Sequence, residues 1–556
     1  MIASEAIVKI LEKEGITDAF GIPGAGINGL YKHLEKAPIK HYLMRHEEAA
    51  VHAADAYYRA SGRLALAICT SGPGATNFVT GIYTAWIDSI PLIAVTGQAN
   101  SALLGKGAFQ CADIAEIVKP VAKRAWRITG ASAIPSVFHE AFETARSGRP
   151  GPVLIDLPLD MQLAEINFSI DSYTPSTLAP PKPDKTLIAQ AVKLLDEAKK
   201  PVIIMGGGVI LAKAEKALID FAEFMNIPVI STYMAKGGMP EDHPLYAGQM
   251  GIQTGAVSSG NDVFLASDLA LGIGCRFTDR HTGAVAVYQG ERKFIHIDID
   301  RKEIGKIIKT ELGIHADASE ALTLLLEAAH AAGNKRTRPN PDVPFKYLRK
   351  KYQRQPNFSR KTLDPREVYE LVNRAFNDDT IFTTGCGLTQ IWSGQYQRIN
   401  KPRKYLPSGG AGTLGFDIPA AIGASVATKK GKAVAIMGDF GFTFLVEELA
   451  VASRYELPVV VIIINNAYLS LIRQNQKYAY QYEYEVAMKE NKGLIDYVKV
   501  SEGLGCTAQR VFSYEEGEKA LARAAAATGT YVVEFIVDDA TDCDMGNDIA
   551  HIRHFD

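Results

Sequence analysis

The chain has 556 residues, of which 47% are hydrophobic and 22% charged, with a formal net charge of −2 at pH 7. This length predicts two to four domains, and the composition is typical of a globular protein with material for several cores. The nearly neutral charge gives no reason to expect a nucleic-acid partner. The longest apolar runs, such as Leu457 to Ile464, are too short to span a bilayer, so no membrane partner is expected.

The N-terminal segment and the cysteines bear on the location of the protein. Met1 to Gly15 has the apolar spacing of an amphipathic helix and carries acidic residues, unlike a signal or transit peptide. The six cysteines are scattered and contain no CxxC pair, which favours reduced thiols. We therefore expect a cytoplasmic protein.

Short apolar runs alternate with helical periodicity along most of the chain, which predicts an α/β fold of three doubly wound parallel-sheet domains. Proline-bearing stretches at Ser172 to Lys185 and Gly333 to Pro344 separate the three blocks. The predicted domains are 1–165, 186–332 and 364–537, followed by a polar tail at 538–556.

The segment Met437 to Arg473 carries the clearest chemical signal. Asp439 follows one apolar strand and Asn466 ends the next. The carboxyl ends of neighbouring parallel strands converge, so these side chains are expected to meet, with a backbone carbonyl just beyond, at Tyr468. Such hard oxygen donors suit Mg²⁺. Because Asp and Asn also favour turns, two ordinary strand-to-loop corners are the alternative.

This pattern resembles the motif of thiamine-diphosphate-dependent enzymes, in which GDG is followed in the next strand by NN. The resemblance covers the whole chain and is to the branch that contains the acetohydroxyacid synthases and glyoxylate carboligases. In that branch a pyrimidine-binding domain, a central domain that often holds FAD and a diphosphate-binding domain follow one another. The resemblance therefore implies thiamine diphosphate, Mg²⁺ and FAD as cofactors.

The segment Arg45 to Gly62 (RHEEAAVHAADAYYRASG) resembles the pyrimidine-activating helix of the family. The resemblance implies that Glu47 hydrogen-bonds N1′ of the aminopyrimidine, which favours the tautomer whose N4′ acts as the base for thiazolium C2. A solvated acidic patch at Glu47 and Glu48 is the alternative. The family resemblance also implies a catalytic role for Gln110 and a substrate contact for Phe109. It further implies cofactor contacts for Pro23, Gly24, Thr70, Gly72 and Asn77.

The segment Ser408 to Ala421 contains a GxGxxG pattern at Gly410 to Gly415. No convincing strand is predicted immediately before it and no acidic residue stands at the expected distance, so we do not predict a dinucleotide site there. The family resemblance instead implies that the Gly412 carbonyl accepts from N4′ and that Leu414 props the cofactor into a bent shape. The other implied contacts are Gly387, Leu388, Thr389, Gln390, Gly438, Asp439, Phe440, Gly441, Asn466, Tyr468 and Leu469, with Asp439, Asn466 and the Tyr468 carbonyl on the metal.

The central block resembles the FAD-holding segments of the branch, where the flavin does no redox work in the main reaction. The implied FAD residues are Gly206, Gly207, Gly208, Gly274, Arg276, Asp298 and Asp317. Triple glycine after a strand is also common in α/β proteins without a flavin. Arg280 matches an arginine that holds a substrate carboxylate, for which a guanidinium fork is suited; a surface or interdomain ion pair is the alternative.

Several residues bear on the substrate. Asn475 stands where acetohydroxyacid synthases have tryptophan, and Phe440 stands where most relatives have glycine. Both features resemble glyoxylate carboligases, which implies condensation of two glyoxylate molecules into tartronate semialdehyde and CO₂, with Leu471 and Ile472 at the reacting centre. Glu47 departs from the valine of those enzymes, so ligation of pyruvate or another 2-oxo acid or aldehyde stays open.

Two further alternatives are an FAD-dependent 2-oxo acid oxidase and a non-catalytic relative. The presence of Glu47, Asp439 and Asn466 disfavours the second. In this family the cofactor cleft forms between the first domain of one subunit and the third domain of another. The resemblance therefore implies a homodimer or homotetramer with active sites at the subunit interface, acting on small 2-oxo acids.

Overall fold

The computed structural model describes residues 1–255, 258–333, 362–488 and 495–555. The predicted linker at Gly333 to Pro344 therefore lies, apart from its first residue, outside the described residues. Three six-stranded parallel sheets make up the molecule, with a short antiparallel pair, β19 (Met545–Gly546) and β20 (Ile552–Arg553), near the C-terminus. This confirms the α/β class with three parallel-sheet domains. Each sheet falls inside one predicted block, and the limits of the blocks stay a prediction.

The first sheet has the order β2-β1-β3-β4-β6-β5, all parallel. Its strands are β1 (Asp18–Gly21), β2 (Lys40–Leu43), β3 (Leu66–Cys69), β4 (Leu92–Gln98), β5 (Arg124–Arg127) and β6 (Pro152–Pro158). The helices are α1 (Ala3–Lys13), α2 (Asn28–Leu34), α3 (Glu47–Ser61), α4 (Pro73–Thr76), α5 (Phe78–Ile87), α6 (Ile114–Ile117), α7 (Ile134–Arg146) and α8 (Leu159–Leu163).

The central sheet has the order β12-β11-β10-β7-β8-β9. Its strands are β7 (Pro201–Met205), β8 (Val229–Ser231), β9 (Tyr246–Gln249), β10 (Leu269–Ile273), β11 (Lys293–Asp298) and β12 (Leu312–His315). The helices are α9 (Lys185–Glu197), α10 (Gly207–Leu211), α11 (Glu215–Met225), α12 (Gly260–Leu265), α13 (Asp279–Thr282), α14 (Val285–Gln289) and α15 (Ala318–Ala331).

The third sheet has the order β14-β13-β15-β16-β18-β17. Its strands are β13 (Ile381–Thr384), β14 (Tyr405–Pro407), β15 (Ala433–Gly438), β16 (Val459–Asn465), β17 (Thr507–Val511) and β18 (Tyr531–Ile536). The helices are α17 (Pro365–Ala375), α18 (Leu388–Tyr396), α19 (Asp417–Ala427), α20 (Asp439–Phe442), α21 (Leu449–Arg454), α22 (Ser470–Asn475), α23 (Tyr497–Gly503) and α24 (Tyr514–Ala526).

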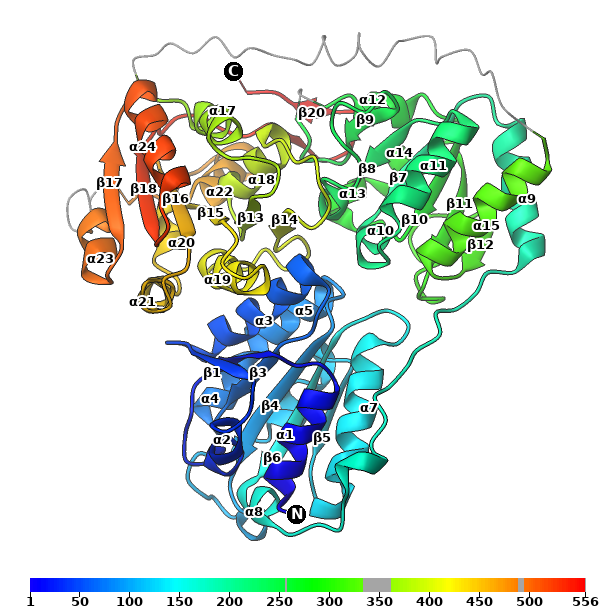
Figure 1. Cartoon of the computed structure of the whole chain (residues 1–556). Helices are drawn as coiled ribbons and strands as arrows, with labels where there is room; N and C mark the ends of the chain where they lie inside the picture. The colour runs from blue at the N-terminus through cyan, green and yellow to red at the C-terminus, as the bar shows by residue number, and fades with distance from the viewer. Residues whose placement is uncertain (256–257, 334–361, 489–494, 556) are drawn as a thin grey trace.

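Both faces of the sheets are covered, because successive side chains of a strand enter different cores. In β3, Ala67 belongs to one buried cluster and Leu66 to another. The cluster with Ala67 also contains Ala435 of β15, so one apolar core runs from the first domain into the third. Helices α3 and α19 form the contact between those domains (Figure 1).

The contact between α3 and α19 depends on small residues. A side-chain carbon added at Gly423 of α19 would lie only 2.0 Å from the carbonyl oxygen of Ala53 in α3. Every residue of α19 is buried, since the helix lies between its own sheet and α3. The backbones of these two helices therefore touch, and the two domains are held in one orientation.

The tail after β18 lies across two domains. Gln474 of α22 exchanges two hydrogen bonds with the backbone of Cys543 (2.7 and 3.0 Å), and Gly546 N–H donates to the Ile252 carbonyl (2.9 Å). The tail thus connects the third domain to the central one, and in Figure 1 its strand β20 lies on the side where these two domains meet.

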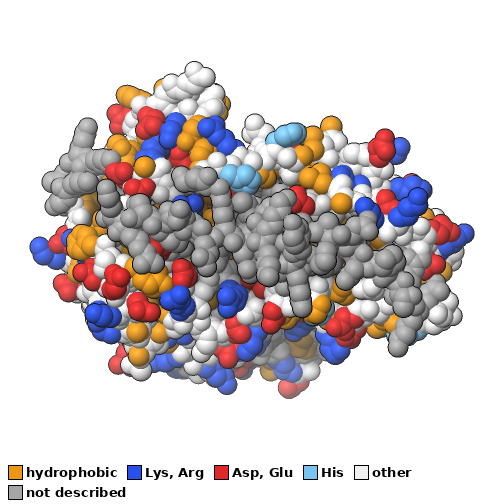
Figure 2. Space-filling model, turned by 90° about the horizontal axis from the view of Figure 1, so that it is seen from above, with side chains coloured by type: hydrophobic (Ala, Val, Ile, Leu, Met, Phe, Trp, Pro, Cys, Tyr) orange, Lys and Arg blue, Asp and Glu red, His pale blue; other side chains and the backbone are white. Residues whose placement is uncertain are grey.

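The surface carries no strong charge pattern on the face that Figure 2 shows, where acidic and basic side chains are interspersed among the described atoms. The six cysteines are all free, which fits the expected reduced thiols. Across the described ranges, the helices are all too short or too polar to cross a bilayer.

Candidate active site

The predicted pyrimidine contacts of the first domain gather at the carboxyl ends of β1 and β3. Glu47 opens α3, and its Oε2 accepts a hydrogen bond from Asn77 Nδ2 (2.9 Å). Its other oxygen lies near Gly74, where an added side-chain carbon would be 3.0 Å away. Thr70, at the end of β3, packs against Gly24 beyond β1. The structure therefore brings Glu47, Asn77, Thr70 and Gly24 together.

The loop 99–113 borders this group. The backbone of Gln110, which has a positive φ of 51°, lies against Gly72, so these two predicted residues are neighbours. Phe109 is 87% exposed and contacts solvent instead of a pocket within this chain. Pro23 is also exposed, beside Gly24. A substrate contact for Phe109 therefore needs a surface that this single chain does not supply.

The predicted metal ligands meet at the ends of β15 and β16. The Asp439 carboxylate accepts from Ala467 N–H (3.0 Å), between Asn466 and Tyr468. Asp439 is 2% exposed, and burial raises its pKa to about 7. Among the residues that the structure describes, it forms no salt bridge with a Lys or Arg. A buried carboxylate without a cation is costly, so this donor set fits a bound Mg²⁺.

The turn after β16 is locally well defined. Ser470 Oγ donates to the Asn466 side-chain oxygen (2.8 Å) and lies 3.1 Å from the Tyr468 carbonyl oxygen. An amide oxygen and a backbone carbonyl therefore stand beside the Asp439 carboxylate, as the strand pattern predicts. Leu469 follows as the residue before α22.

The predicted diphosphate contacts line the same edge of the third sheet. Gly387 caps α18 with a φ of 98°, and Leu388, Thr389 and Gln390 form the first turn of that helix. A side-chain carbon added at Gly438 would lie 4.0 Å from Thr389, and one added at Gly441 would lie 3.8 Å from Leu414. Phe440 lies against Phe444, with 5.4 Å between ring centroids. The first turn of α18 thus lies near Gly438, the residue before Asp439, and free backbone N–H groups at a helix start are suited to phosphate.

The GxGxxG segment corrects one expectation. Strand β14 ends at Pro407, so a strand does precede Gly410 to Gly415, and α19 follows. The expectation of no strand was wrong because β14 has three residues at the edge of the sheet, too few to give an apolar pattern. A dinucleotide site is still disfavoured, since β13 separates β14 from β15 and the segment does not join adjacent strands.

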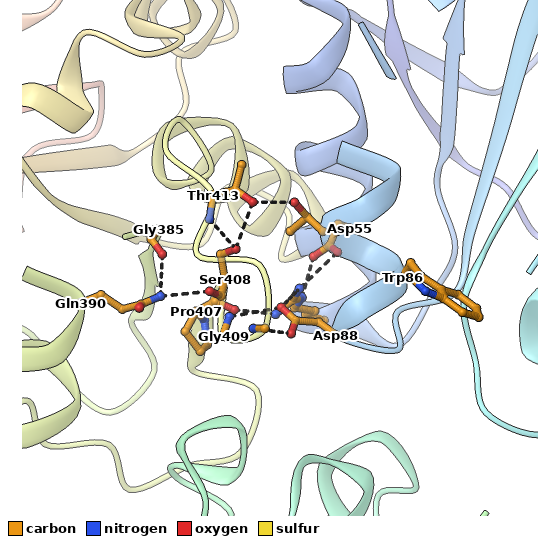
Figure 3. A network of polar contacts seen from close by, with 12 residues as sticks. Asp55, Trp86, Asp88, Gly385, Gln390, Pro407, Ser408, Gly409 and Thr413 are labelled. Atoms are coloured by element: carbon orange, nitrogen blue, oxygen red, sulfur yellow. Dashed lines mark hydrogen bonds and ion pairs between the residues drawn. The ribbon is translucent and has the colours of Figure 1, made fainter. Parts of the chain in front are cut away.

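The segment 407–413 is held by a polar network that the sequence did not indicate. Figure 3 shows Asp55 and Asp88 of the first domain opposite Pro407, Gly409 and Thr413 of the third. Arg59 donates to Asp55, Asp88 and the Pro407 carbonyl. Ser408, Gln390 and Gly385 continue the network inside the third domain (Figure 3). The pairing of Asp55 and Arg59 on consecutive turns of α3 was the one local signal for it.

A second contact between these domains involves Glu448, which follows α20. Its Oε1 accepts from the N–H groups of Arg45 and His46, immediately before Glu47 (3.0 and 2.8 Å). Glu448 is fully buried, and burial raises its pKa to about 8. The sequence gave no reason to single out this residue. The start of α3, and with it Glu47, is therefore fixed by the third domain of the same chain.

A cavity of about 290 Å³ lies where the three domains meet. Five of the predicted FAD residues line it, namely Gly207, Gly208, Gly274, Arg276 and Asp298. Gly208 and Gly274 pack backbone against backbone, with 2.7 Å between an added carbon on the first and Cα of the second. Burial raises the pKa of Asp298 to about 6.

Two predicted FAD residues lie elsewhere. Asp317 caps α15, where its carboxylate accepts from the Ser319 and Glu320 N–H groups, and it does not line the cavity. This position is explained by helix capping, for which Asp is favoured. Gly206 follows β7 and is not among the lining residues; a side-chain carbon added there would meet the Gly274 carbonyl.

Arg280 lies in α13 on the wall of the cavity. Its charge acts on the Cys386 thiol, whose pKa is nevertheless raised, chiefly by burial. Cys386 in turn is the neighbour of Gly412, at 3.5 Å from a carbon added there. Arg280 is exposed at the cavity wall, and among the described residues it forms no salt bridge, so the structure shows neither of the ion pairs that were the alternative.

The residues expected at the reacting centre lie on α22. Leu471 is half-buried, whereas Ile472 is 49% exposed and Asn475 is exposed. Between them, Arg473 and Gln474 are buried against the tail. One face of α22 is therefore fixed by the tail, and the face with Ile472 and Asn475 is open.

The predicted cofactor-binding side chains of the two halves do not contact each other by hydrogen bonds within the described chain, although Glu448 joins the backbone before Glu47 to the third domain. Among the described residues, no hydrogen bond connects Glu47, Thr70 or Asn77 to the segments around Gly412 and Asp439. Each half is formed at the carboxyl ends of its own sheet.

Comparison with known proteins identifies the family. Models of the thiamine pyrophosphate enzymes match residues 1–117 (N-terminal TPP binding domain), 188–325 (central domain) and 385–535 (C-terminal TPP binding domain). This chain belongs to the thiamine pyrophosphate enzyme family. The resemblance inferred from the Asp439 and Glu47 segments is thereby confirmed.

Relatives of this thiamine pyrophosphate enzyme align along its full length. It is 44% identical over 572 aligned positions to glyoxylate carboligase of Escherichia coli, covering 100% of this chain and 96% of the relative. It is 41% identical to the acetolactate synthase large subunit of Corynebacterium glutamicum, over 97% of this chain and 87% of the relative. A probable acetolactate synthase large subunit of Methanocaldococcus jannaschii is 39% identical, over 97% and 92%.

Proposed function

We propose that this enzyme condenses two molecules of glyoxylate into one tartronate semialdehyde, with uptake of one proton and release of one CO₂. The observation that carries the proposal is the meeting of Asp439, Asn466 and the Tyr468 carbonyl at the ends of β15 and β16. The choice of glyoxylate is supported by the full-length similarity to glyoxylate carboligase, and by Asn475 and Phe440.

Three groups of this chain would hold Mg²⁺, namely the Asp439 carboxylate, the Asn466 amide oxygen and the Tyr468 carbonyl. Bound thiamine diphosphate supplies a ring that stabilises the negative charge left on carbon after decarboxylation. The first turn of α18, with Gly387, Leu388, Thr389 and Gln390, would bind the diphosphate with its N–H groups. The protein thereby orients the cofactor without taking part in the redistribution of electrons.

Glu47 would hold a proton at N1′ of the pyrimidine, and the Gly412 carbonyl would accept one at N4′. Leu414 would support the bend of the cofactor between its two rings. Asn77 orients Glu47 through the hydrogen bond to Oε2. These residues bring a base next to the reacting carbon without a titrating side chain at that carbon.

Arg280 would bind the carboxylate of a 2-oxo acid, because a guanidinium forms paired hydrogen bonds with a carboxylate. Phe109, Gln110, Leu471, Ile472 and Asn475 would enclose the substrates and limit water. Exclusion of water protects the reactive carbon from protonation, so that the second glyoxylate carbonyl is attacked instead.

We also propose that the cavity between the domains binds FAD. Gly207, Gly208 and Gly274 let the ligand approach the backbone, Arg276 supplies charge for its phosphates, and Asp298 suits a ribose hydroxyl. In a carboligase this flavin would have no electron to transfer. Extraction of the purified protein with acid tests this directly, since released FAD is fluorescent.

The two half-sites support a further part of the proposal, that the enzyme is at least a homodimer. The Glu47 half of one copy would face the Asp439 half of another. Exposed Phe109, Ile472 and Asn475 would then be covered by the partner.

An acetolactate-type ligation of pyruvate is the second candidate. Glu47 favours it, because the glyoxylate carboligases that the chain otherwise resembles have valine there. The acetolactate synthase relatives, at 39% and 41% identity, support the same alternative.

Product analysis by mass spectrometry separates the candidates. The protein is incubated with thiamine diphosphate and Mg²⁺, and with glyoxylate and pyruvate, separately and together. We expect tartronate semialdehyde from glyoxylate alone. Acetolactate as the main product would favour the second candidate, peroxide under air would indicate an oxidase, and no CO₂ from either acid would overturn the proposal.

A further inference from the structure

The segment that carries Gly412 is held by a charged group of the first domain. Arg59, at the end of α3, is buried and donates from Nη1 to the Pro407 carbonyl (2.7 Å). The same guanidinium donates to Asp55 (2.5 Å) and to Asp88 (3.0 Å). Arg59 therefore fixes the point at which β14 ends and the segment begins.

Asp88 holds Gly409 and Gly410, which follow Ser408 in this segment. Its Oδ2 accepts from Gly409 N–H (3.2 Å) and its Oδ1 from Gly410 N–H (2.8 Å). A side-chain carbon at Gly410 would lie 2.8 Å from both Asp88 Oδ1 and Ile87 Cγ1, so glycine is needed for this approach. One carboxylate thus binds two consecutive backbone groups of the segment.

A third contact fixes the far side of Gly412. The hydroxyl groups of Thr84 in α5 and Thr413 lie 2.7 Å apart, and Thr413 N–H donates to Ser408 Oγ (3.0 Å). Gly412 N–H donates to the Ser408 carbonyl (3.0 Å), and Gly412 has a φ of 62°. Its peptide is therefore held before and after by the first domain.

The charges of this network favour one arrangement. One guanidinium faces two carboxylates, and the two N–H groups on Asp88 offset the additional negative charge. Charged hydrogen bonds in a buried site are strong, and loss of one partner leaves a charge without compensation. A small displacement of the segment would break several of these bonds together.

We propose that Asp88 and Arg59 are positioning residues that set the Gly412 carbonyl for its contact with the aminopyrimidine. The proposal rests on the proposed function, in which Gly412 accepts from N4′. It assigns α3 two tasks at its opposite ends: Glu47 acts on a cofactor directly, and Arg59 orients the backbone that holds a cofactor. Neither Asp88 nor Arg59 touches the reacting atoms.

The first test uses the protein without cofactor. In Asp88→Asn one acceptor oxygen becomes a donor, so Gly409 and Gly410 cannot both stay bonded. We expect faster hydrogen–deuterium exchange of amides in 408–413 than in the wild type, with unchanged exchange in β15 and β16. Equal exchange of 408–413 in both proteins would overturn the proposal.

The second test uses the protein with thiamine diphosphate and Mg²⁺. A displacement of about 1 Å can reduce a rate about 10²-fold, so we expect slower C2 proton exchange of this order in Asp88→Asn. The near-ultraviolet circular dichroism band of the bound aminopyrimidine should change, and kcat should fall more than KM for glyoxylate changes. Wild-type values for C2 exchange and for the band would contradict the proposal.

Two controls separate positioning from loss of stability. Glu14→Gln alters another buried carboxylate of the first domain, bonded to Arg146 and Tyr173 far from the segment. It should leave C2 exchange and the dichroism band unchanged even if the protein is less stable. Thr84→Val should slow C2 exchange and Thr84→Ser should restore it. If Asp88→Asn does not fold, equal rates in the two Thr84 variants overturn the proposal.

The failure of the proposed function has a different signature. A wild-type protein that does not exchange C2 of thiamine diphosphate would overturn both the proposed function and this role. A wild type that exchanges C2, with variants that exchange it equally fast, would overturn the positioning role alone.

Discussion

Glu47 lies in the first turn of α3, where free N–H groups of the helix favour a negative charge. In the described part of the chain, Asn77 is the one side chain that hydrogen-bonds its carboxylate, through Oε2. Oε1 faces Gly74, where the absence of a side chain leaves room. The carboxylate is thus oriented by one neighbour and has a second oxygen for a ligand.

Glu47→Gln should slow C2 proton exchange of bound thiamine diphosphate by about 10²- to 10⁴-fold, the usual contribution of general acid–base catalysis. The amide keeps the shape and the bond to Asn77 but cannot hold a proton at N1′ in the same way. Affinity for Mg²⁺ and the diphosphate should change little, because Asp439 and Asn466 are untouched. Rapid acid quench followed by NMR measures the exchange, and a wild-type rate would remove Glu47 from the mechanism.

The site residues differ in how far the sequence could predict them. Asp439 and Asn466 end long apolar runs, so strand pattern alone was enough to bring them together. Glu47 was indicated by family resemblance, since an acidic residue at a helix start is common. Asp88 and Gly410 are 322 positions apart, and no local pattern reports such a contact. Their hydrogen bond depends on the packing of α3 against α19.

Prediction from the sequence was also limited for the strands. Strands β4 and β16 are buried on both faces and read as continuous apolar runs, so they were expected. Strands β5 (RAWR) and β17 (TAQRV) lie at sheet edges and are only partly buried, so their polar residues obscured them. Strand β14 also lies at a sheet edge, but it was missed because it has only three residues, all of them buried. The central strands therefore defined the fold class, and the edges needed the structure.

Two histidines of the central domain, His281 in α13 and His296 in β11, are buried, and burial lowers the pKa of each from 6.5 to about 4. The unfolded chain would bind protons that the folded domain cannot. The two neutral histidines therefore make their full contribution to the free energy of unfolding above pH 6.5. As the pH falls toward 4, the free energy of unfolding decreases by on the order of 3 kcal/mol for each histidine. Asp298, with a pKa raised to about 6 by burial, acts in the opposite sense.

His296→Gln should accordingly reduce the loss of stability between pH 7 and pH 4.5. The measurement is the urea midpoint of the central-domain transition at several pH values, relative to the wild type. His551→Gln, at an exposed position, serves as the control and should leave the pH dependence unchanged. Identical pH dependence in the wild type and His296→Gln would show that His296 is protonated as easily in the folded as in the unfolded chain.

At the scale of the whole molecule, the two half-sites give a test of assembly. Glu47→Gln and Asp439→Ala should each be inactive alone. If each active site combines two copies, a mixed dimer has one site with both changes and one site with neither. Co-expression in equal amounts should then restore about a quarter of the wild-type activity, because about half of the dimers are mixed. No recovery in dimers shown to be mixed would indicate that each site forms within one chain.

The wall of the central cavity has a consequence for how ligands affect one another. Gly409 and Gly410 line that cavity, and their N–H groups also donate to Asp88. Gly410 stands two positions before Gly412 in the sequence. A molecule that fills the cavity would restrict the same backbone that the cofactor needs ordered. Thermodynamic reciprocity then requires that each ligand raise the affinity of the other by one common factor. A flavin that never exchanges an electron would still contribute to turnover, as an effector built into the architecture of the enzyme.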